Sequence, residues 1–221
     1  MLRVRFAGLV WAYYASLLLG ALAFHVYLKR ATGSGLIGAL PREYLPPGYR
    51  FKMAVGGLSS LVWLLTPPAV LAFPSLFRHL VPITSLQLPA VQILGAGFLI
   101  VGALASLVAC LQLGSSLRVL IPEESDSTKL ITTGLFGKCR NPFYSGLLLS
   151  FVGILLLLPN LVLVVAMTAG VLNLHERVRV EERFLGRRFG KQYEDYCQIV
   201  PRYIPRLLNS KGPTLTQTPG N

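Results

Sequence analysis

Five long apolar stretches alternate with polar segments along the chain. They cover residues 6–28, 53–77, 89–113, 143–158 and 161–174. An α-helix needs about 20 apolar residues to cross the hydrocarbon core of a bilayer. The first three stretches have that length, whereas the last two, at about 15 residues each, are slightly short. The pattern predicts an all-α, polytopic membrane protein with about five transmembrane helices.

The last two stretches predict a C-terminal helical hairpin. Only Pro159 and Asn160 separate them, and both residue types favour turns. Beyond residue 174 the sequence becomes densely charged, while apolar residues continue between the charges as in an amphipathic helix. These apolar residues are Val178, Val180, Phe184, Leu185 and Phe189. We therefore expect the second arm of the hairpin to continue as a cytoplasmic amphipathic helix.

Composition divides the chain into three parts. Residues 1–113 hold transmembrane helices 1–3, and residues 114–208 hold a polar segment, the hairpin and the charged C-terminal segment. Residues 209–221 form a polar tail that we expect to be disordered. Pro67 and Pro68 predict a kink in the second helix. Small residues in the third stretch permit close contact with another helix. They are Gly95, Gly97, Gly102, Ala103 and Ala105.

The first apolar stretch also has features of a secretory signal. Arg3 and Arg5 precede it, and residues 21–23 (Ala-Leu-Ala) offer a cleavage pattern of small residues. The apolar run continues past that position, however, and further apolar stretches follow. A transmembrane helix is the favoured interpretation.

Charge patterning supports a membrane setting. Hydrophobic residues make up 53% of the chain and charged residues 14%, with a net charge of +12, whereas soluble domains carry about 25% charged residues. The basic residues lie between the apolar stretches and in the C-terminal third, which favours contact with membrane lipid over nucleic acid. Residues 29–52, residues 114–142 and the C-terminus are basic and are expected inside. Five crossings then place the N-terminus outside, although Arg3 and Arg5 oppose this.

Several classes of site find no support in the sequence. The three cysteines, Cys110, Cys139 and Cys197, form no CxxC pair and have no histidine at metal spacing, so neither a metal site nor a disulfide framework is expected. The apolar stretches carry no Asp or Glu, which argues against a proton relay or ion pathway. The phosphate-loop, zinc-protease and serine-hydrolase motifs do not occur.

Two polar segments beside the apolar stretches could carry chemistry. In the first, residues 130–146, a glycine-punctuated loop leads into a helix, with Asn141 as its cap and Pro142 at its first position. The free amides of such a helix start favour an anionic group, although an ordinary cap is an equally simple interpretation. In the second segment, Arg177 and Glu181 are four residues apart and share one helix face. A surface ion pair of little energetic value would look the same.

Together the two segments resemble the isoprenylcysteine carboxyl methyltransferase family, within the wider group of membrane methyltransferases that includes phospholipid N-methyltransferases. The family pattern is T-x-G-x-Y-x-x-x-R-H-P-x-Y-x-G, a tight hairpin, R-x-x-x-E-E, F-G-x-x-Y-x-x-Y and V-P. The matching residues here are Thr132, Gly134, Arg140, Pro142, Tyr144, Gly146, Arg177, Glu181, Glu182, Phe189, Gly190, Tyr193, Tyr196, Val200 and Pro201. The resemblance covers about residues 120–206 and keeps the order and spacing of the pattern.

The resemblance implies a cytoplasmic-side pocket for S-adenosyl-L-methionine and methylation of the terminal carboxylate of a prenylated cysteine or a similar lipophilic acceptor. Carried over by position, the cofactor-binding residues are Thr128, Lys129, Leu130, Ile131, Phe136, Asn141, Pro142, Phe143, Tyr144 and Glu181. Arg177 would face the acceptor carboxylate, and it and Glu181 are the candidate catalytic residues. A carboxylate is already ionised at neutral pH, because its pKa is about 3.5. No general base is therefore needed. The planar fork of an arginine suits it.

Three positions depart from the family pattern and bear on the acceptor. Asn141 stands where a histidine is expected, Phe136 where a tyrosine is expected, and Thr128 where another histidine is expected. Asn still forms hydrogen bonds and Phe keeps the ring. His175, at the membrane exit of the hairpin, is a further candidate for the pocket wall.

Other functions stay open on the sequence alone. An amine or thiol acceptor, such as a phospholipid headgroup, would have to lose a proton and would benefit from a base. Membrane sterol reductases, which bind NADPH, share a similar C-terminal half, but their motif N-Y-x-G-D ends in an acid where this chain has Leu147. A membrane scaffold or transporter subunit is the remaining alternative. The oligomeric state and the membrane, bacterial inner membrane or endoplasmic reticulum, stay open as well.

Overall fold

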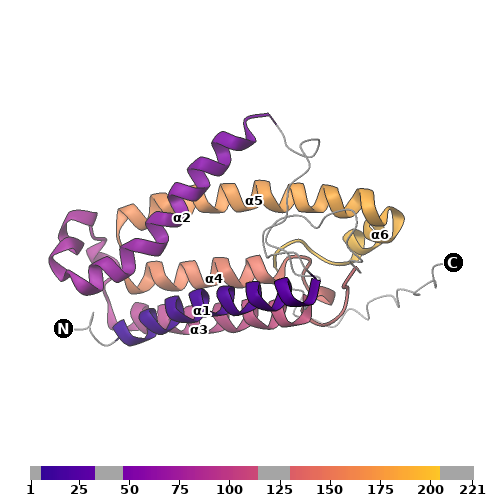
Figure 1. Cartoon of the computed structure of the whole chain (residues 1–221). Coiled ribbons are helices and arrows are strands. Elements are labelled where there is room, and N and C mark those ends of the chain that lie inside the picture. Colours follow the sequence, from indigo (N-terminus) through magenta and orange to yellow (C-terminus); the bar gives the residue numbers. More distant parts are fainter. Residues whose placement is uncertain (1–5, 33–46, 114–129, 205–221) are drawn as a thin grey trace.

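The computed structural model describes residues 6–32, 47–113 and 130–204. The named secondary-structure elements in these ranges are all helices (Figure 1). The α-helices are α1 (Ala7–Thr32), α2 (Tyr49–Ala72), α3 (Pro89–Leu113), α4 (Pro142–Leu157), α5 (Leu161–Phe189) and α6 (Lys191–Ile199). Short 3-10 helices are η3 (Pro74–Leu80), η4 (Thr84–Leu86) and η6 (Gly134–Gly137). The all-α prediction is confirmed for this part of the chain.

The helix boundaries follow the apolar pattern closely except in α2. The third stretch coincides with α3, and the second arm of the hairpin continues through the charged residues to Phe189, as expected. The second stretch was predicted to end at residue 77, which is wrong, because α2 ends at Ala72 and Pro74 opens η3 instead. Proline has no backbone N–H to continue an α-helix. Pro67 and Pro68 lie inside α2, and the predicted kink stays a prediction.

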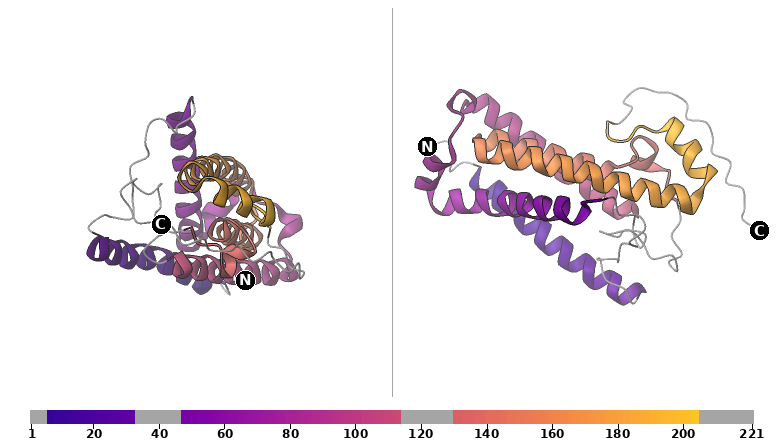
Figure 2. Two further views of the ribbon diagram at one scale, coloured as in Figure 1. Left: turned by 90° about the vertical axis from the view of Figure 1, so that its right-hand side faces the viewer. Right: turned by 90° about the horizontal axis from the view of Figure 1, so that it is seen from above.

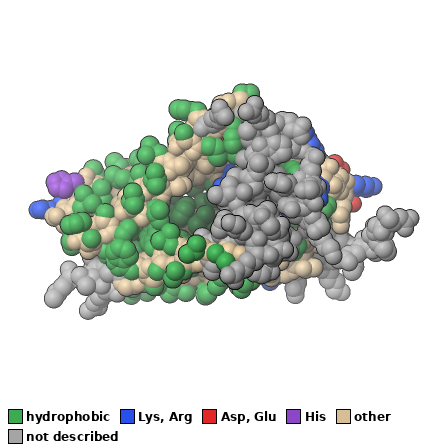
Figure 3. All heavy atoms as spheres, in the orientation of Figure 1, with side chains coloured by type: hydrophobic (Ala, Val, Ile, Leu, Met, Phe, Trp, Pro, Cys, Tyr) green, Lys and Arg blue, Asp and Glu red, His purple; other side chains and the backbone are tan. Residues whose placement is uncertain are grey.

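Three described helices are long and apolar enough to cross a membrane: Phe51–Ala72, Pro89–Leu113 and Leu161–Phe189. The shorter apolar helices are Gly8–Gly20 and Pro142–Leu157. The number of five crossings therefore stays a prediction. Hydrophobic side chains cover much of the flank that Figure 3 shows, as expected for a surface in contact with lipid.

The helices run alternately in opposite directions, so that particular ends meet (Figures 1 and 2). The C-terminal end of α3, the N-terminal ends of α2 and α4, the charged half of α5 and α6 all lie toward one end of the molecule, which we call the α6 end. The turn between α4 and α5 lies at the opposite end, with η3. The described helix ends that flank the basic segments thus share one end, and the cytoplasmic position of these segments stays a prediction. The tail at residues 209–221 lies outside the described residues.

The two arms of the hairpin pack mainly against different partners, α4 against α3 and α5 against α2. Their connection is held by Asn160, which is fully buried. Its side-chain oxygen accepts a hydrogen bond from the backbone N–H of Leu163 at 2.9 Å, and its amide donates to the carbonyl of Leu158 at 2.7 Å. Asn160 therefore caps α5 at its N-terminus. The tight hairpin connection predicted at Pro159 and Asn160 is confirmed.

Small residues bring α3 and α4 into close contact. A Cβ at Gly102 would lie 2.5 Å from the backbone oxygen of Gly146, and one at Gly153 would lie 2.5 Å from the backbone nitrogen of Leu99. Ser106 adds a hydrogen bond of 3.1 Å to the carbonyl of Phe143. The close helix contact that the small residues predicted is therefore made within the chain. The contact also joins residues 1–113 to residues 114–208, the first two parts that composition indicated. The division into these parts stays a prediction.

This contact predicts a difference between two glycines of α3. Gly102→Ala places a methyl group against backbone atoms, which cannot move aside by a change of rotamer. We expect a loss of about 1–3 kcal/mol of stability. Gly97→Ala is the matched control, because nothing lies within 4 Å of a Cβ at that position, and alanine favours a helix. Thermal unfolding of both variants in detergent measures the difference. Equal stability of the two variants would show that the α3–α4 contact is looser than described.

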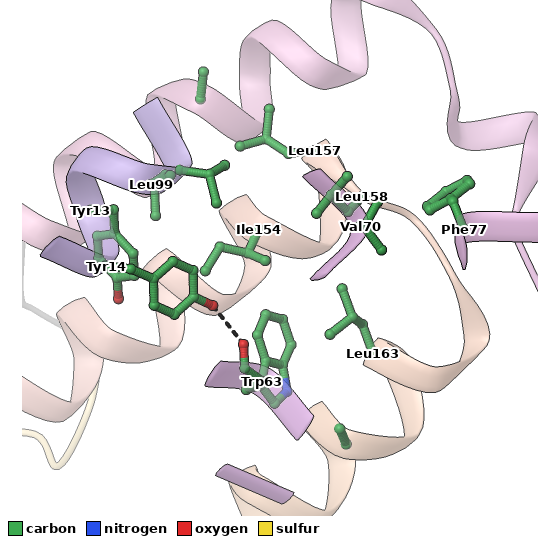
Figure 4. Close-up of a cluster of buried hydrophobic side chains, with 13 residues drawn as sticks. Tyr13, Tyr14, Trp63, Val70, Phe77, Leu99, Ile154, Leu157, Leu158 and Leu163 are labelled. Atoms are coloured by element: carbon green, nitrogen blue, oxygen red, sulfur yellow. Dashed lines mark hydrogen bonds between the residues drawn. The ribbon is translucent and has the colours of Figure 1, made fainter. Parts of the chain in front are cut away.

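Aromatic residues join α1 and α2 to the centre of the bundle (Figure 4). The hydroxyl of Tyr14 donates to the backbone carbonyl of Trp63 at 2.6 Å. The Trp63 ring stacks on Phe151 of α4, with 4.8 Å between ring centroids. Leu99 and Ile154, both almost fully buried, belong to the same cluster. This cluster holds together the helices that carry the candidate site at the α6 end of the molecule.

Candidate active site

A partly buried carboxylate connects α4 with the charged half of α5, beyond the apolar part of that helix. Oε1 of Glu181 accepts a hydrogen bond from the hydroxyl of Tyr144 at 2.6 Å and one from Nε of Arg177 at 3.4 Å. Tyr144 lies in the first turn of α4. Arg177 and Glu181 share one helix face, as predicted, and form an ion pair of 3.4 Å. The hydrogen bond from Tyr144 of α4 distinguishes this pair from an exposed surface pair.

The pair is electrostatically unusual because it is largely removed from water. The side chains of Arg177 and Glu181 are 25% and 23% exposed. Arg177 and the hydrogen bond from Tyr144 both stabilise the ionised form of this carboxylate against the cost of its partial burial. Nη2 of Arg177 is buried and has no hydrogen-bond partner among the described residues. One nitrogen of the guanidinium therefore forms no hydrogen bond with the described part of the chain.

The neighbouring Glu182 holds the C-terminal segment in place. Its carboxylate accepts hydrogen bonds from Arg202 at 2.6 and 2.9 Å, and Arg140 lies 3.6 Å away. The same hydrogen bonds are the main cause that raises the pKa of Arg202. Such paired geometry between arginine and carboxylate is specific as well as strong. The two adjacent glutamates thus serve different neighbours.

Asn141 does not act as the predicted helix cap. It occupies the position before Pro142, but its side chain accepts no capping hydrogen bond. Its amide donates instead to Glu182 at 3.3 Å and to the carbonyl of Arg202 at 3.2 Å. A hydrogen bond to an ionised carboxylate is stronger than one between two neutral groups, which favours the contact with Glu182 over a cap. The prediction of a cap is therefore wrong in its side-chain contact and right in its position.

Residues 201–203 run beside the start of α4. Backbone amides of Arg140 and Asn141 donate to the carbonyls of Pro201 at 2.8 Å and Arg202 at 3.2 Å. The hydroxyl of Tyr203 and Nδ1 of His175 are 2.9 Å apart. His175 therefore contacts the segment beside α4, and its place in a pocket wall stays a prediction. The roles of Arg202 and Tyr203 had no signal in the sequence beyond their position after the family's V-P pair.

The loop with Phe136 is held from two sides. Its carbonyl accepts a hydrogen bond of 2.6 Å from the hydroxyl of Tyr196 in α6, and the side chain of Gln112 in α3 accepts one of 3.0 Å from the amide of Leu135. Gly134 has a φ of 64°, and a Cβ there would clash with Gln112, so glycine is required twice over. Phe136 is consequently buried against the α6 side of the site.

The remaining predicted residues divide into two groups. Pro142 is buried, and the ring of Phe143 meets that of Tyr144 edge-on, with centroids 5.3 Å apart. Leu130 packs against the cluster around Tyr193 and Tyr196. Ile131 is half-buried nearby in the chain, whereas Thr128 and Lys129 lie outside the described residues. Of the described candidates, Leu130 and Phe136 lie beside α6 and Asn141–Tyr144 lie at the start of α4; their role in binding a cofactor stays a prediction.

Tyr49, the first residue of α2, also belongs to this region and was missed by the sequence reasoning. Its ring packs against Val180 and Phe184 of α5. No local signal indicated this, because the contact joins residues far apart in the chain. Within the described ranges no three histidine, cysteine or acidic side chains cluster as metal ligands, and the three cysteines are free.

Long apolar helices with a buried cluster of ionisable and aromatic side chains at one end define an α-helical integral membrane protein with a polar site. Comparison with known proteins gives the family. Protein-S-isoprenylcysteine O-methyltransferase A of Arabidopsis thaliana is 31% identical over 154 residues, which cover 69% of this chain and 73% of that protein. The chain belongs to the isoprenylcysteine carboxyl methyltransferase family.

Other comparisons agree with this assignment. The family model described as phospholipid methyltransferase matches residues 90–192. Protein-S-isoprenylcysteine O-methyltransferase B of A. thaliana is 34% identical over 113 residues, 50% of this chain, and the match spans 57% of that protein's length. The corresponding share is 61% for a probable enzyme of this name from Oryza sativa. The chain thus matches little more than half the length of these relatives.

A solved structure confirms the fold. The eukaryotic intramembrane Ras methyltransferase, isoprenylcysteine carboxyl methyltransferase, superposes with a TM-score of 0.62 over 93% of this chain and 68% of that chain. The two sequences are 21% identical, so the likeness concerns the fold alone. It establishes the polytopic membrane architecture that the apolar pattern predicted.

Proposed function

We propose that this chain is an integral membrane methyltransferase that uses S-adenosyl-L-methionine to methylate the carboxylate of a prenylated cysteine or a similar lipophilic acceptor. The observation that carries the proposal is the Arg177–Glu181–Tyr144 cluster, which places an incompletely paired guanidinium among apolar helices. The related O-methyltransferases indicate the reaction, and the cluster provides an arginine and a glutamate that suit its acceptor and its cofactor. The described helix ends that flank the basic segments lie at the α6 end, which supports a cytoplasmic position for the site.

The cofactor fits the polar and aromatic residues at the junction of α4, α5 and α6. S-adenosyl-L-methionine supplies an electrophilic methyl group on a positively charged sulfur. The residues proposed to hold it are Thr128, Lys129, Leu130, Ile131, Phe136, Asn141, Pro142, Phe143, Tyr144 and Glu181. Both described hydrogen bonds to Glu181 end on Oε1, so Oε2 would accept from a ribose hydroxyl or the amino group. The carboxylate would also favour a cationic donor electrostatically.

The acceptor carboxylate would be held by Arg177. Nη2 of this arginine is buried without a partner, and a carboxylate oxygen would satisfy it by a charge-assisted hydrogen bond. The transfer forms a bond from carboxylate oxygen to methyl carbon and breaks the carbon–sulfur bond, so no proton moves. The protein then has to position the two reactants and exclude water. The apolar flank of the bundle lets a lipophilic acceptor approach from the bilayer.

A second candidate within the same class is N-methylation of a phospholipid headgroup, which the match to the phospholipid methyltransferase model favours. An amine must lose its proton before or during transfer and would use a base. Such an acceptor would also bring a positive charge toward Arg177. The arginine therefore favours the carboxylate acceptor.

Calorimetry on the detergent-solubilised protein tests the class of enzyme. We expect S-adenosylhomocysteine to bind and NADPH, titrated in parallel, not to bind. Methyl transfer from radiolabelled donor is then measured to N-acetyl-S-farnesylcysteine and to phosphatidylethanolamine, and we expect label in the first only. Binding of NADPH alone would favour a reductase, label in the phospholipid would favour the second candidate, and binding of neither ligand by folded protein would contradict the enzymatic function.

A further inference from the structure

The first turns of α2 are fastened to α5 at successive points. Gly56 is buried, and a Cβ there would clash with the side chain of Asn173. The amide of Asn173 donates to the backbone carbonyl of Lys52 at 2.6 Å, and Nζ of Lys52 lies 3.3 Å from Oε1 of Glu176. Residues nearer the start of α2 therefore contact residues of α5 that lie nearer the site. The two helices have one fixed register in this region.

Tyr49 lies one turn beyond Lys52 in this register. Its side chain is only 6% exposed and packs against Val180 and Phe184. Val180 is three residues after Arg177, and positions three and four apart on a helix share one face. Tyr49 therefore covers the face of α5 that carries Arg177 and Glu181. Helix α2 therefore packs beside the site through Tyr49, while α4 contacts it through Tyr144.

Two buried hydrogen-bond donors on this face have no partner. The hydroxyl of Tyr49 and Nη2 of Arg177 are both removed from solvent, and neither meets an acceptor among the described residues. Each such orphan costs about 1–3 kcal/mol, and native proteins rarely keep them without a function. Burial raises the pKa of Tyr49, so its hydroxyl keeps its proton at neutral pH and remains a donor. The charge of Arg177 also acts on the Tyr49 hydroxyl, so the two donors are near enough to suit a ligand with two acceptor oxygens.

We propose that Tyr49 is a second ligand of the acceptor carboxylate, donating its hydroxyl proton to one oxygen while Nη2 of Arg177 binds the other. The inference rests on the proposed function and adds to it a residue from α2. Neutral hydroxyl and charged guanidinium together fix the carboxylate plane, whereas Arg177 alone leaves it free to rotate about one contact. Tyr49 would thus select a carboxylate over a neutral amide at the end of a lipophilic acceptor.

The variant Tyr49→Phe tests the inference because it removes only the hydroxyl. We expect the KM for N-acetyl-S-farnesylcysteine to rise about tenfold, the loss of one hydrogen bond to a charged group, with the affinity for S-adenosylhomocysteine unchanged within twofold. Inhibition by the carboxamide analogue of the acceptor should change much less. Tyr13→Phe is the matched control: Tyr13 is also 6% exposed with an unpartnered hydroxyl, but it packs in the cluster around Leu99 and Ile154.

The outcomes separate this inference from the proposed function. An unchanged KM in Tyr49→Phe, with an active wild type, would overturn the role of Tyr49 and leave the function standing. A parallel loss of S-adenosylhomocysteine binding would also overturn it, since it would mean that the hydroxyl supports the site as a whole. Absence of methyl transfer by the wild type would overturn the function and the inference together. Thermal unfolding confirms that both phenylalanine variants are folded.

Discussion

Glu181→Ala is expected to abolish binding of S-adenosylhomocysteine, raising its Kd by about a hundredfold or more. Glu181 is the junction of the site, because it accepts hydrogen bonds from Tyr144 of α4 and from Arg177 of its own helix. Hydrogen bonds with a charged partner contribute about 1.5–3 kcal/mol each. The loss of the proposed cofactor contact, together with disorder of Tyr144 and Arg177, therefore corresponds to a hundredfold or more. Calorimetry of the solubilised protein measures it.

The isosteric variant Glu181→Gln separates charge from shape. Its amide oxygen still accepts from Tyr144, so we expect a smaller loss, about tenfold. Glu194→Ala is the matched control, since Glu194 is an exposed glutamate on α6 and its removal should leave affinity unchanged. Wild-type affinity in Glu181→Ala would contradict the cofactor pocket at this junction. It would also move the search for the donor site away from α5.

The helices could be predicted from sequence because lipid imposes a simple rule on them. A helix that spans a bilayer satisfies its backbone hydrogen bonds internally, and its apolar length is set by the membrane. The bounds of α3 and the connection at Asn160 therefore follow from local pattern alone. The end of α2 does not, because apolar residues continue into η3 while Pro74 stops the α-helix. Hydropathy measures which residues enter an apolar environment and carries no information on that change of helix type.

The candidate site was predictable where its contacts are local and otherwise was not. Arg177 and Glu181 are joined by helix periodicity, which a sequence displays directly. The contacts of Asn141 with Glu182 and of Tyr203 with His175 join residues from different elements. Their partners are chosen by the packing of α4 and α5, which no single segment encodes. Tyr49 is the clearest case, since its place beside Val180 depends on the register of α2 against α5.

Arg177→Ala is expected to lower kcat/KM for the lipophilic acceptor by about a hundredfold or more, while the Kd of S-adenosylhomocysteine rises less than tenfold. Truncating one partner of a buried charged contact costs about 2–5 kcal/mol, which is a hundredfold at about 2.7 kcal/mol. The cofactor is affected less, because Glu181 keeps its hydrogen bond of 2.6 Å from Tyr144 when its weaker contact of 3.4 Å with Arg177 is lost. Steady-state methylation of N-acetyl-S-farnesylcysteine and calorimetry measure the two effects.

Two further variants decide what Arg177 contributes. Arg177→Lys keeps the charge but loses the planar fork, so we expect an acceptor defect between those of the wild type and the alanine variant. Arg179→Ala is the matched control, because Arg179 is an exposed arginine two residues further along α5 and therefore faces away from Glu181. Equal losses of acceptor and cofactor in Arg177→Ala would mean that the arginine only supports Glu181. A selective loss of the acceptor would place Nη2, the atom left without a partner, on the carboxylate.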